Sequence, residues 1–222
     1  MSSSARLRKT HTDFGGGATI NSDIAKNLET QLISIMPTAL ELLKEKYPDI
    51  TFEYKRRVYK KELQERLGSP VGGYHELSNP YFKPDAGVIF ADGIPIYFGE
   101  AKRQGTNVQR ILEGLPSQSR GNAIERVFKN FREIEIIMYA QDIFPFAVFI
   151  FGCDFVAGSS LLDRLTGATC GFPFNEIYVD KSQHPMPRAT LFVQPHGFTE
   201  KEMLDKTLEV CDESLRCILK NR

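Results

Sequence analysis

Residues 146–152 read Phe-Ala-Val-Phe-Ile-Phe-Gly, a run with no polar position. A strand with one face in water alternates apolar and polar residues, whereas a strand covered on both faces does not. The run is much shorter than the roughly 18 apolar residues that a bilayer-spanning helix requires. It therefore predicts a strand in the middle of an α/β sheet, with other elements packed on both of its faces.

Helical patterns lie on both sides of this run. The spacing of apolar residues predicts helices over residues 21–46, 58–67 and 123–140, and a short one over 159–165. Pro37 should kink or divide the first of them. Thr199 and Glu202 form a capping-box pattern at the start of a last helix that extends to about Lys220.

The remaining apolar runs are short and predict strands. Three of them lie at residues 50–54, 176–179 and 189–194. Two more, Asp85–Phe90 and Ile94–Gly99, are joined by Ala91-Asp92-Gly93, and Asp-Gly supplies the positive φ that a hairpin turn requires. The order of elements predicts an α/β fold with a central mixed β-sheet flanked by helices.

The 222 residues, of which 41% are hydrophobic and 25% charged, suit one soluble globular domain. We expect it to span residues 21–222 and to follow a mobile polar arm over residues 1–20. The positively charged N-terminus is followed by no apolar core, so we expect no signal peptide, no membrane association and a cytoplasmic protein. The four cysteines form no C-x-x-C pair and are expected to be reduced thiols.

Two carboxylates lie at neighbouring strand ends of the predicted hairpin. Asp85 opens the first strand and Glu100 follows the second, and strand alternation places Lys102 on the same face as Glu100. Hard cations such as Mg²⁺ take oxygen ligands and usually only one or two protein carboxylates. Asp85, Glu100 and the carbonyl of Ala101 are therefore candidate metal ligands. The alternative is a surface hairpin with a Glu–Lys pair.

Such a site would hydrolyse phosphodiesters. A cation held by Asp85 and Glu100 would activate water and neutralise charge in the transition state. Lys102 would orient or help to deprotonate the attacking water and hold the scissile phosphate. The chemistry expected is in-line attack of water on a phosphodiester.

The segment Arg120-Gly121-Asn122-Ala123-Ile124-Glu125-Arg126 combines residue types that suit recognition of DNA bases. Arginine can contact guanine and asparagine adenine in bidentate fashion, and small residues allow close approach. The alternative is a helix start capped by Asn122. Residues 55–66 and 100–132 are locally basic, which fits binding of a polyanion on one face or, for 55–66, a solvated helix face.

These motifs carry a resemblance to a known family. Lys83-Pro84-Asp85, Glu100-Ala101-Lys102-x-Gln104-Gly105, Gly121–Arg126 and Leu162-Asp163-Arg164-Leu165-Thr166 occur in the same order as in the EcoRI family of type II restriction endonucleases. That family belongs to the PD-(D/E)xK nuclease superfamily, so the resemblance implies a restriction-endonuclease-like core. The looser similarity extends from about residue 24 to the final helix.

The resemblance implies a role for each matching residue. Asp85 and Glu100 match the metal-binding acids, Ala101 the backbone-carbonyl ligand and Lys102 the catalytic lysine. Residues that match the family's DNA-binding set are Gln104, Arg120, Gly121, Asn122, Ala123, Arg126 and Arg164. Glu125 matches a glutamate that positions the recognition arginines.

The outer base pair of the expected site stays open. The family's namesake has an arginine where this chain has apolar Leu161. Arg120 instead precedes the Gly-Asn-Ala string, as it does in MunI, a relative that reads CAATTG. We expect an AATT core, with CAATTG favoured over a relaxed outer pair and over GAATTC.

The resemblance implies a homodimeric, Mg²⁺-dependent endonuclease that cuts double-stranded DNA at a palindrome. It would leave 5′-phosphates and 5′ overhangs, and a cognate DNA methyltransferase would accompany it. Two alternatives are a repair or structure-specific nuclease with the same core, and a sequence-specific DNA-binding protein without catalysis.

Overall fold

The computed structural model describes residues 28–68, 80–103, 122–152, 165–166, 171, 173–182 and 186–220. In chain order the elements are α3 (Met36–Lys46), β1 (Phe52–Lys55), β2 (Val58–Tyr59), α4 (Lys60–Leu67), β3 (Tyr81–Phe82), β4 (Gly87–Ala91), β5 (Ile94–Arg103), α6 (Asn122–Ile137), β6 (Phe146–Phe151), β7 (Thr190–Gln194) and α8 (Glu200–Lys220).

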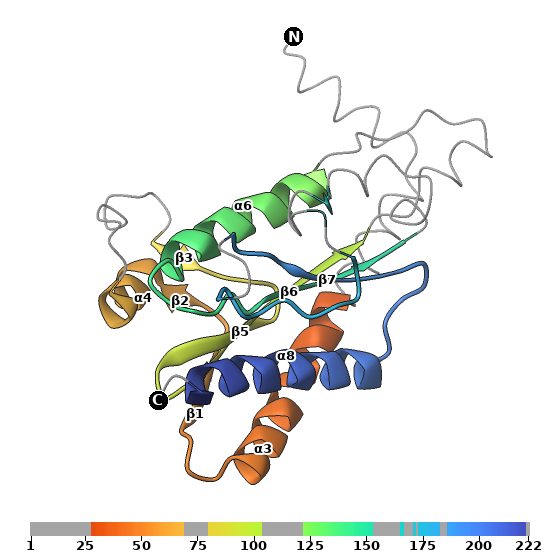
Figure 1. Ribbon diagram of the computed structural model, residues 1–222. Coiled ribbons are helices and arrows are strands. Elements are labelled where there is room, and N and C mark those ends of the chain that lie inside the picture. The colour runs from red at the N-terminus through yellow and green to blue at the C-terminus, as the bar shows by residue number, and fades with distance from the viewer. Residues whose placement is uncertain are drawn as a thin grey trace, which may run out of the picture.

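A five-stranded sheet in the order β1-β4-β5-β6-β7 forms the centre of the fold. The pairs β1–β4 and β4–β5 are antiparallel, whereas β5–β6 and β6–β7 are parallel, so the sheet is mixed. Helix α6 lies on one side of the sheet, and α3 and α8 lie on the other (Figure 1). This is the predicted α/β architecture with a central mixed sheet flanked by helices.

Strand β6 is buried along its whole length, as its sequence predicts. Parallel neighbours cover both of its edges, and aromatic side chains pack on its faces. Phe146 contacts Phe144 edge-on, and Phe149 packs against Phe192 of β7 and Phe198. A polar substitution anywhere in β6 would therefore meet the apolar core.

The hairpin β4–β5 positions the candidate site. Its two-residue turn has positive φ at both Asp92 (49°) and Gly93 (82°), the geometry predicted from the Asp-Gly pair. Pairing with β4 ends at Gly99, but β5 continues to Arg103 alongside β6. Glu100 and Lys102 therefore lie inside a strand, beyond the end of its antiparallel neighbour.

Of the three longer helices predicted, over residues 21–46, 123–140 and from Thr199 to about Lys220, the last two begin and end close to the expected residues, as α6 and α8. The first is interrupted at Ile35, and α3 begins at Met36 with Pro37 in its first turn, so Pro37 divides the helix. Its first predicted residues, like the arm over 1–20, lie outside the described residues. Helix α8 begins after Thr199, whose hydroxyl accepts a hydrogen bond from the backbone N–H of Glu202 at 3.2 Å.

Two predicted elements differ from the structure, and a third falls almost entirely outside the described residues. The helix predicted over 58–67 begins only at Lys60, because Val58 and Tyr59 pair with β3 as a small two-stranded sheet. Residues 176–179 are not a strand, since the backbone N–H of Tyr178 bonds to the hydroxyl of Thr190 (3.0 Å) instead of a ladder partner. Of the helix predicted over 159–165, only residue 165 is described.

Helix α8 is anchored to β5 by buried polar contacts. The hydroxyl of Thr207 bonds to that of Tyr97 at 3.1 Å, and the hydroxyl of Ser214 donates to the carbonyl of Ile96 at 2.8 Å.

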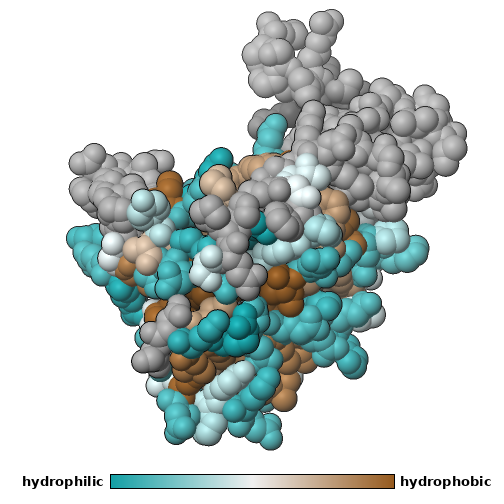
Figure 2. Space-filling model, viewed as in Figure 1, coloured by the Kyte–Doolittle hydropathy of each residue, from teal (hydrophilic) through white to brown (hydrophobic). Residues whose placement is uncertain are grey.

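No helix in the described ranges is long and apolar enough to cross a bilayer. The face drawn in Figure 2 is mostly hydrophilic, with apolar side chains emerging near α3 and α8.

Candidate active site

A tight turn joins Asp85 to the point where β4 and β5 separate. The N–H of Ala86 donates to the carbonyl of Gly99 at 2.8 Å, and the N–H of Gly87 to that of Pro84 at 3.0 Å. Gly87 has φ +79°, and a Cβ on it would lie 2.6 Å from the carbonyl oxygen of Lys55, so only glycine fits. The turn thus holds Asp85 against the extension of β5.

Asp85, Glu100 and Lys102 converge as the sequence predicts. Nζ of Lys102 lies 2.6 Å from Oδ2 of Asp85, 2.5 Å from Oε2 of Glu100 and 3.1 Å from the carbonyl oxygen of Ala101. The N–H of Ala101 donates to Asp85 Oδ2 at 3.1 Å. The structure therefore favours a built cluster over a surface hairpin with a simple Glu–Lys pair.

The three ionisable groups differ in burial and so in protonation. Glu100 is 1% exposed; burial and hydrogen bonding with Asp85 raise its pKa well above the ordinary value, against the opposing charge of Lys102. Burial alone would raise the pKa of Asp85, but hydrogen bonding with Glu100 and the charge of Lys102 outweigh it and lower that pKa.

Lys102 stays protonated in this environment. Burial lowers its pKa, but the charges of Glu100 and Asp85 outweigh that effect, and the net shift is upward. An ammonium group therefore lies among two carboxylate oxygens and one carbonyl oxygen. A second positive charge here would favour the ionised form of Glu100.

The oxygen atoms around Lys102 fit a hard divalent cation. Asp85 and Glu100 supply carboxylates and Ala101 a carbonyl, which is the kind of ligand set that Mg²⁺ accepts together with water and substrate phosphates. Within the described ranges no three His, Cys, Asp or Glu side chains are grouped to hold a metal. The cation would therefore depend on two carboxylates, the backbone carbonyl and the substrate.

Asn130 of α6 is a member of this cluster that the sequence reasoning missed. Its side-chain amide donates a hydrogen bond to Oε1 of Glu100. Asn130 lies on the inward face of α6, between the buried residues Val127, Phe131 and Ile134. A polar residue on an otherwise apolar helix face was the signal that could have identified it.

The segment predicted to recognise DNA, residues 120–126 (the recognition segment), overlaps the start of the same helix. Asn122 is the first residue of α6, and Glu125 and Arg126 are exposed in its first turns. Arg126 lies one turn before Asn130. Four other candidate DNA-binding residues lie outside the described residues: Gln104, Arg120, Gly121 and Arg164. For Asn122 and Ala123 only the backbone is described.

The basic run over residues 55–66 is largely neutralised. Lys55 and Arg66 pair with Glu62 at 3.2 and 2.7 Å, and Lys61 pairs with Glu65 at 3.7 Å. Lys60 is buried and pairs with Glu133 of α6 at 3.3 Å. The ion pairs favour the interpretation of this run as a helix face over that of a polyanion-binding patch.

Comparison with known proteins identifies the relatives of this chain. The family model described as restriction endonuclease EcoRI matches residues 14–161. The chain is 27% identical to the type II restriction enzyme EcoRI of Escherichia coli over an alignment of 261 positions, which covers 97% of this chain and 94% of that enzyme. It is 25% identical to the type II restriction enzyme RsrI of Cereibacter sphaeroides over 247 residues, covering 92% and 89%.

Proposed function

Because the chain belongs to the EcoRI family of type II restriction endonucleases, which are site-specific deoxyribonucleases, we propose that it is a homodimer that uses Mg²⁺ to cut DNA at a palindrome with an AATT core. The observation that carries this proposal is the convergence of Asp85, Glu100 and Lys102 where β5 runs past the end of β4. Helix α6, which begins in the recognition segment, contacts that convergence through Asn130.

Each group in the cluster has a distinct task. Asp85, Glu100 and the carbonyl of Ala101 would hold the cation, which when bound supplies Lewis-acid stabilisation of the phosphate and activation of water. Lys102 is a protonated donor in a partly exposed position. It can hydrogen-bond an oxygen of the scissile phosphate or the attacking water, which orients the two for in-line displacement.

Sequence recognition would come from the recognition segment. Asn122, Ala123 and Arg126 would contact the inner bases and Glu125 would hold the recognition arginines, with contributions from Gln104, Gly121 and Arg164. Arg120 favours CAATTG, ahead of a relaxed outer pair and of GAATTC. The exposed position of Arg126 in the first turns of α6 supports this assignment.

A two-fold dimer explains how one chain reads a palindrome, since each protomer would supply one half-site contact surface and one catalytic cluster. Cleavage would leave 5′-phosphates and four-base 5′ overhangs. A methyltransferase that modifies the same site would protect the host DNA. Both enzymes would act where that DNA lies, in the cytoplasm.

Sequencing of cleaved ends tests the proposal. A random-sequence plasmid library is incubated with the protein and Mg²⁺, with EDTA and the Glu100→Gln protein as parallel controls. We expect discrete four-base 5′ overhangs within AATT-containing sites in the Mg²⁺ reaction and intact plasmid in both controls. Ends that share no sequence, or cutting that persists in EDTA, would overturn the proposal. Duplexes that differ only in the outer pair then rank CAATTG against GAATTC.

A further inference from the structure

The carboxylate of Glu100 is held from two directions. Oε2 accepts from Nζ of Lys102 on the same strand, and Oε1 accepts from the side-chain amide of Asn130 on α6. The residue is 1% exposed, so water does not orient these oxygens. The direction of the carboxylate in the site is therefore determined by two hydrogen-bond donors.

These two donors are not equivalent. Lys102 is shared, because its ammonium group also contacts Asp85 and the carbonyl of Ala101. It is also the group expected to turn toward the phosphate during the reaction. When it does, Glu100 keeps the bond from Asn130 and its hydrogen bonding with Asp85, and of these two only Asn130 is a neutral donor anchored on a different element, helix α6.

The surroundings of Asn130 indicate that its amide is there for this bond. Its neighbours on the inward face of α6, Val127, Phe131 and Ile134, are buried apolar residues. Asn130 itself is half-buried, so its amide loses part of its contact with water and needs a hydrogen-bond partner in exchange. Glu100 is that partner, and an apolar residue of similar size would pack there without orienting it.

We propose that Asn130 is a positioning residue: its amide holds Oε1 and so fixes the rotamer of Glu100 with Oε2 pointing at Lys102. This inference rests on the assignment of Glu100 to the catalytic cluster in the proposed function. It also joins α6 to β5, so that the helix carrying Glu125 and Arg126 and the strand carrying Glu100 cannot shift independently.

The experiment compares variants that keep or remove the donor. Asn130→Leu keeps the side-chain volume without an N–H, Asn130→Ala is a smaller second deletion, and Asn130→Gln retains the amide. Glu135→Gln is the matched control on the same helix, since Glu135 pairs with Arg132 at 2.5 Å and lies five residues after Asn130, roughly 140° around the helix at 3.6 residues per turn. Three quantities are measured for each protein. Calorimetry gives the affinity of the protein–DNA complex for Ca²⁺, and quenched-flow experiments give the single-turnover cleavage rate with Mg²⁺. Fluorescence titration gives the affinity for DNA in the absence of metal.

We expect Asn130→Leu and Asn130→Ala to lose about 10- to 100-fold in both Ca²⁺ affinity and cleavage rate, the usual effect of removing a partner of a metal ligand. Asn130→Gln should recover part of the loss. Metal-free DNA affinity should stay within about threefold of that of Glu135→Gln. In a Glu100→Gln background, Asn130→Leu should cause no further loss of Ca²⁺ affinity, because coupled residues are not additive.

Two results would overturn the inference. One is a Ca²⁺ affinity and a cleavage rate equal to those of Glu135→Gln. The other is a metal-free DNA affinity that falls as far as the cleavage rate, which would make Asn130 a DNA contact. Failure of the proposed site itself would look different, since Glu100→Gln would then cleave normally.

Discussion

Nζ of Lys102 lies 2.5 Å from Oε2 of Glu100, the one carboxylate that is buried among the described residues. A charge at the edge of a core is costly unless it is paired and hydrogen-bonded. Here the pairing is complete before any substrate arrives, because Asn130 and Asp85 take part in the same network. The catalytic groups are preorganised by the protein itself.

Glu100→Gln should remove cleavage and leave DNA binding intact. The amide keeps the shape of the side chain but is a poor ligand for a hard cation, and several kcal/mol of transition-state stabilisation should be lost, a rate decrease of about a thousandfold or more. Single-turnover cleavage and metal-free binding of a CAATTG duplex give the two numbers. Normal turnover in this variant would show that the site assignment is wrong.

Arg126→Ala should weaken binding to AATT-containing DNA by about 1–3 kcal/mol for each base it contacts and should relax discrimination. Competition binding with cognate and random duplexes measures both the loss of affinity and the loss of discrimination. Arg132→Ala is the control, because Arg132 lies further along the same helix and pairs with Glu135. An equal loss on both duplexes would identify Arg126 as a phosphate contact instead.

Gly99→Ala should damage both stability and catalysis. A Cβ on Gly99 would lie 2.5 Å from the hydroxyl of Tyr97 and 2.6 Å from Cβ of Ala86, and Tyr97 is buried and bonded to Thr207. Overpacking of this kind costs about 1–3 kcal/mol, and displacement of Ala86 would move Asp85. Gly197→Ala, where a Cβ meets nothing within 4 Å, is the matched control in denaturant unfolding and cleavage assays. Equal stability of the two variants would contradict the geometry.

Thr199→Ala should lower the free energy of unfolding by about 1 kcal/mol, since it removes a cap of α8. Thermal or urea unfolding of the two proteins at neutral pH measures the difference. No change in stability would mean that the start of α8 is held by its packing on β5 alone.

The same cap should respond to pH. Hydrogen bonds from the backbone N–H and hydroxyl of Thr199 lower the pKa of Glu202 below its ordinary 4.5. A carboxyl group whose pKa is depressed in the folded state adds stability above its unfolded pKa, and that stability is lost as the pH falls through the folded value. The difference in stability between wild type and Glu202→Ala should thus be full at neutral pH and shrink below pH 4.5. A difference that is constant down to pH 2 would rule out this role.

Local signals were sufficient for much of the fold. The Asp-Gly pair predicted the hairpin, and the apolar run predicted the buried strand β6. Thr199 and Glu202 predicted the start of α8. Each of these features depends on residues that are close together in the sequence. Strand alternation placed Glu100 and Lys102 on one face once the hairpin was known, whereas Asp85 is held beside them by the turn before β4. For DNA recognition, only Glu125 and Arg126 have described side chains, and their role stays a prediction.

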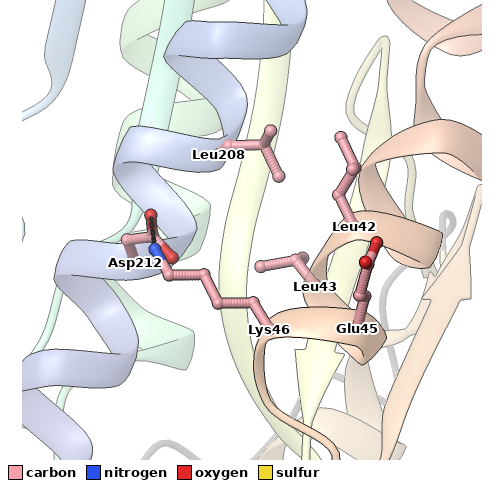
Figure 3. Close-up of a pocket in the computed structure, with 6 residues that line it drawn as sticks. All are labelled: Leu42, Leu43, Glu45, Lys46, Leu208 and Asp212. Atoms are coloured by element: carbon pink, nitrogen blue, oxygen red, sulfur yellow. Dashed lines mark hydrogen bonds and ion pairs between the residues drawn. The ribbon is translucent and has the colours of Figure 1, made fainter.

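Contacts between distant segments could not be read in advance. Lys60 pairs with Glu133, more than seventy residues away, so this ion pair could not be read from the basic run, whereas the Lys61–Glu65 and Arg66–Glu62 pairs have the i,i+4 spacing of a helix. Residues 176–179 have a strand-like pattern, but the backbone N–H of Tyr178 donates to the side-chain hydroxyl of Thr190 and not to a backbone carbonyl of a neighbouring strand. A cavity of about 410 Å³ lies between α3 and α8 and is lined by Leu42, Leu208 and Asp212, among others (Figure 3). An ion pair between Lys46 and Asp212, at 2.7 Å, joins the two helices beside it. Neither helix sequence on its own predicts this cavity.

The turn at Asp92-Gly93 and the carboxylate of Glu100 lie at opposite ends of strand β5, roughly 20 Å apart at the usual rise of a strand. Lengthening the hairpin would therefore change the outline of the molecule at one end and leave its chemistry at the other. Members of a family built on this strand can evolve hairpins of different lengths around an unchanged centre. The same separation makes the turn a place to attach a fluorescent label for observing the working enzyme.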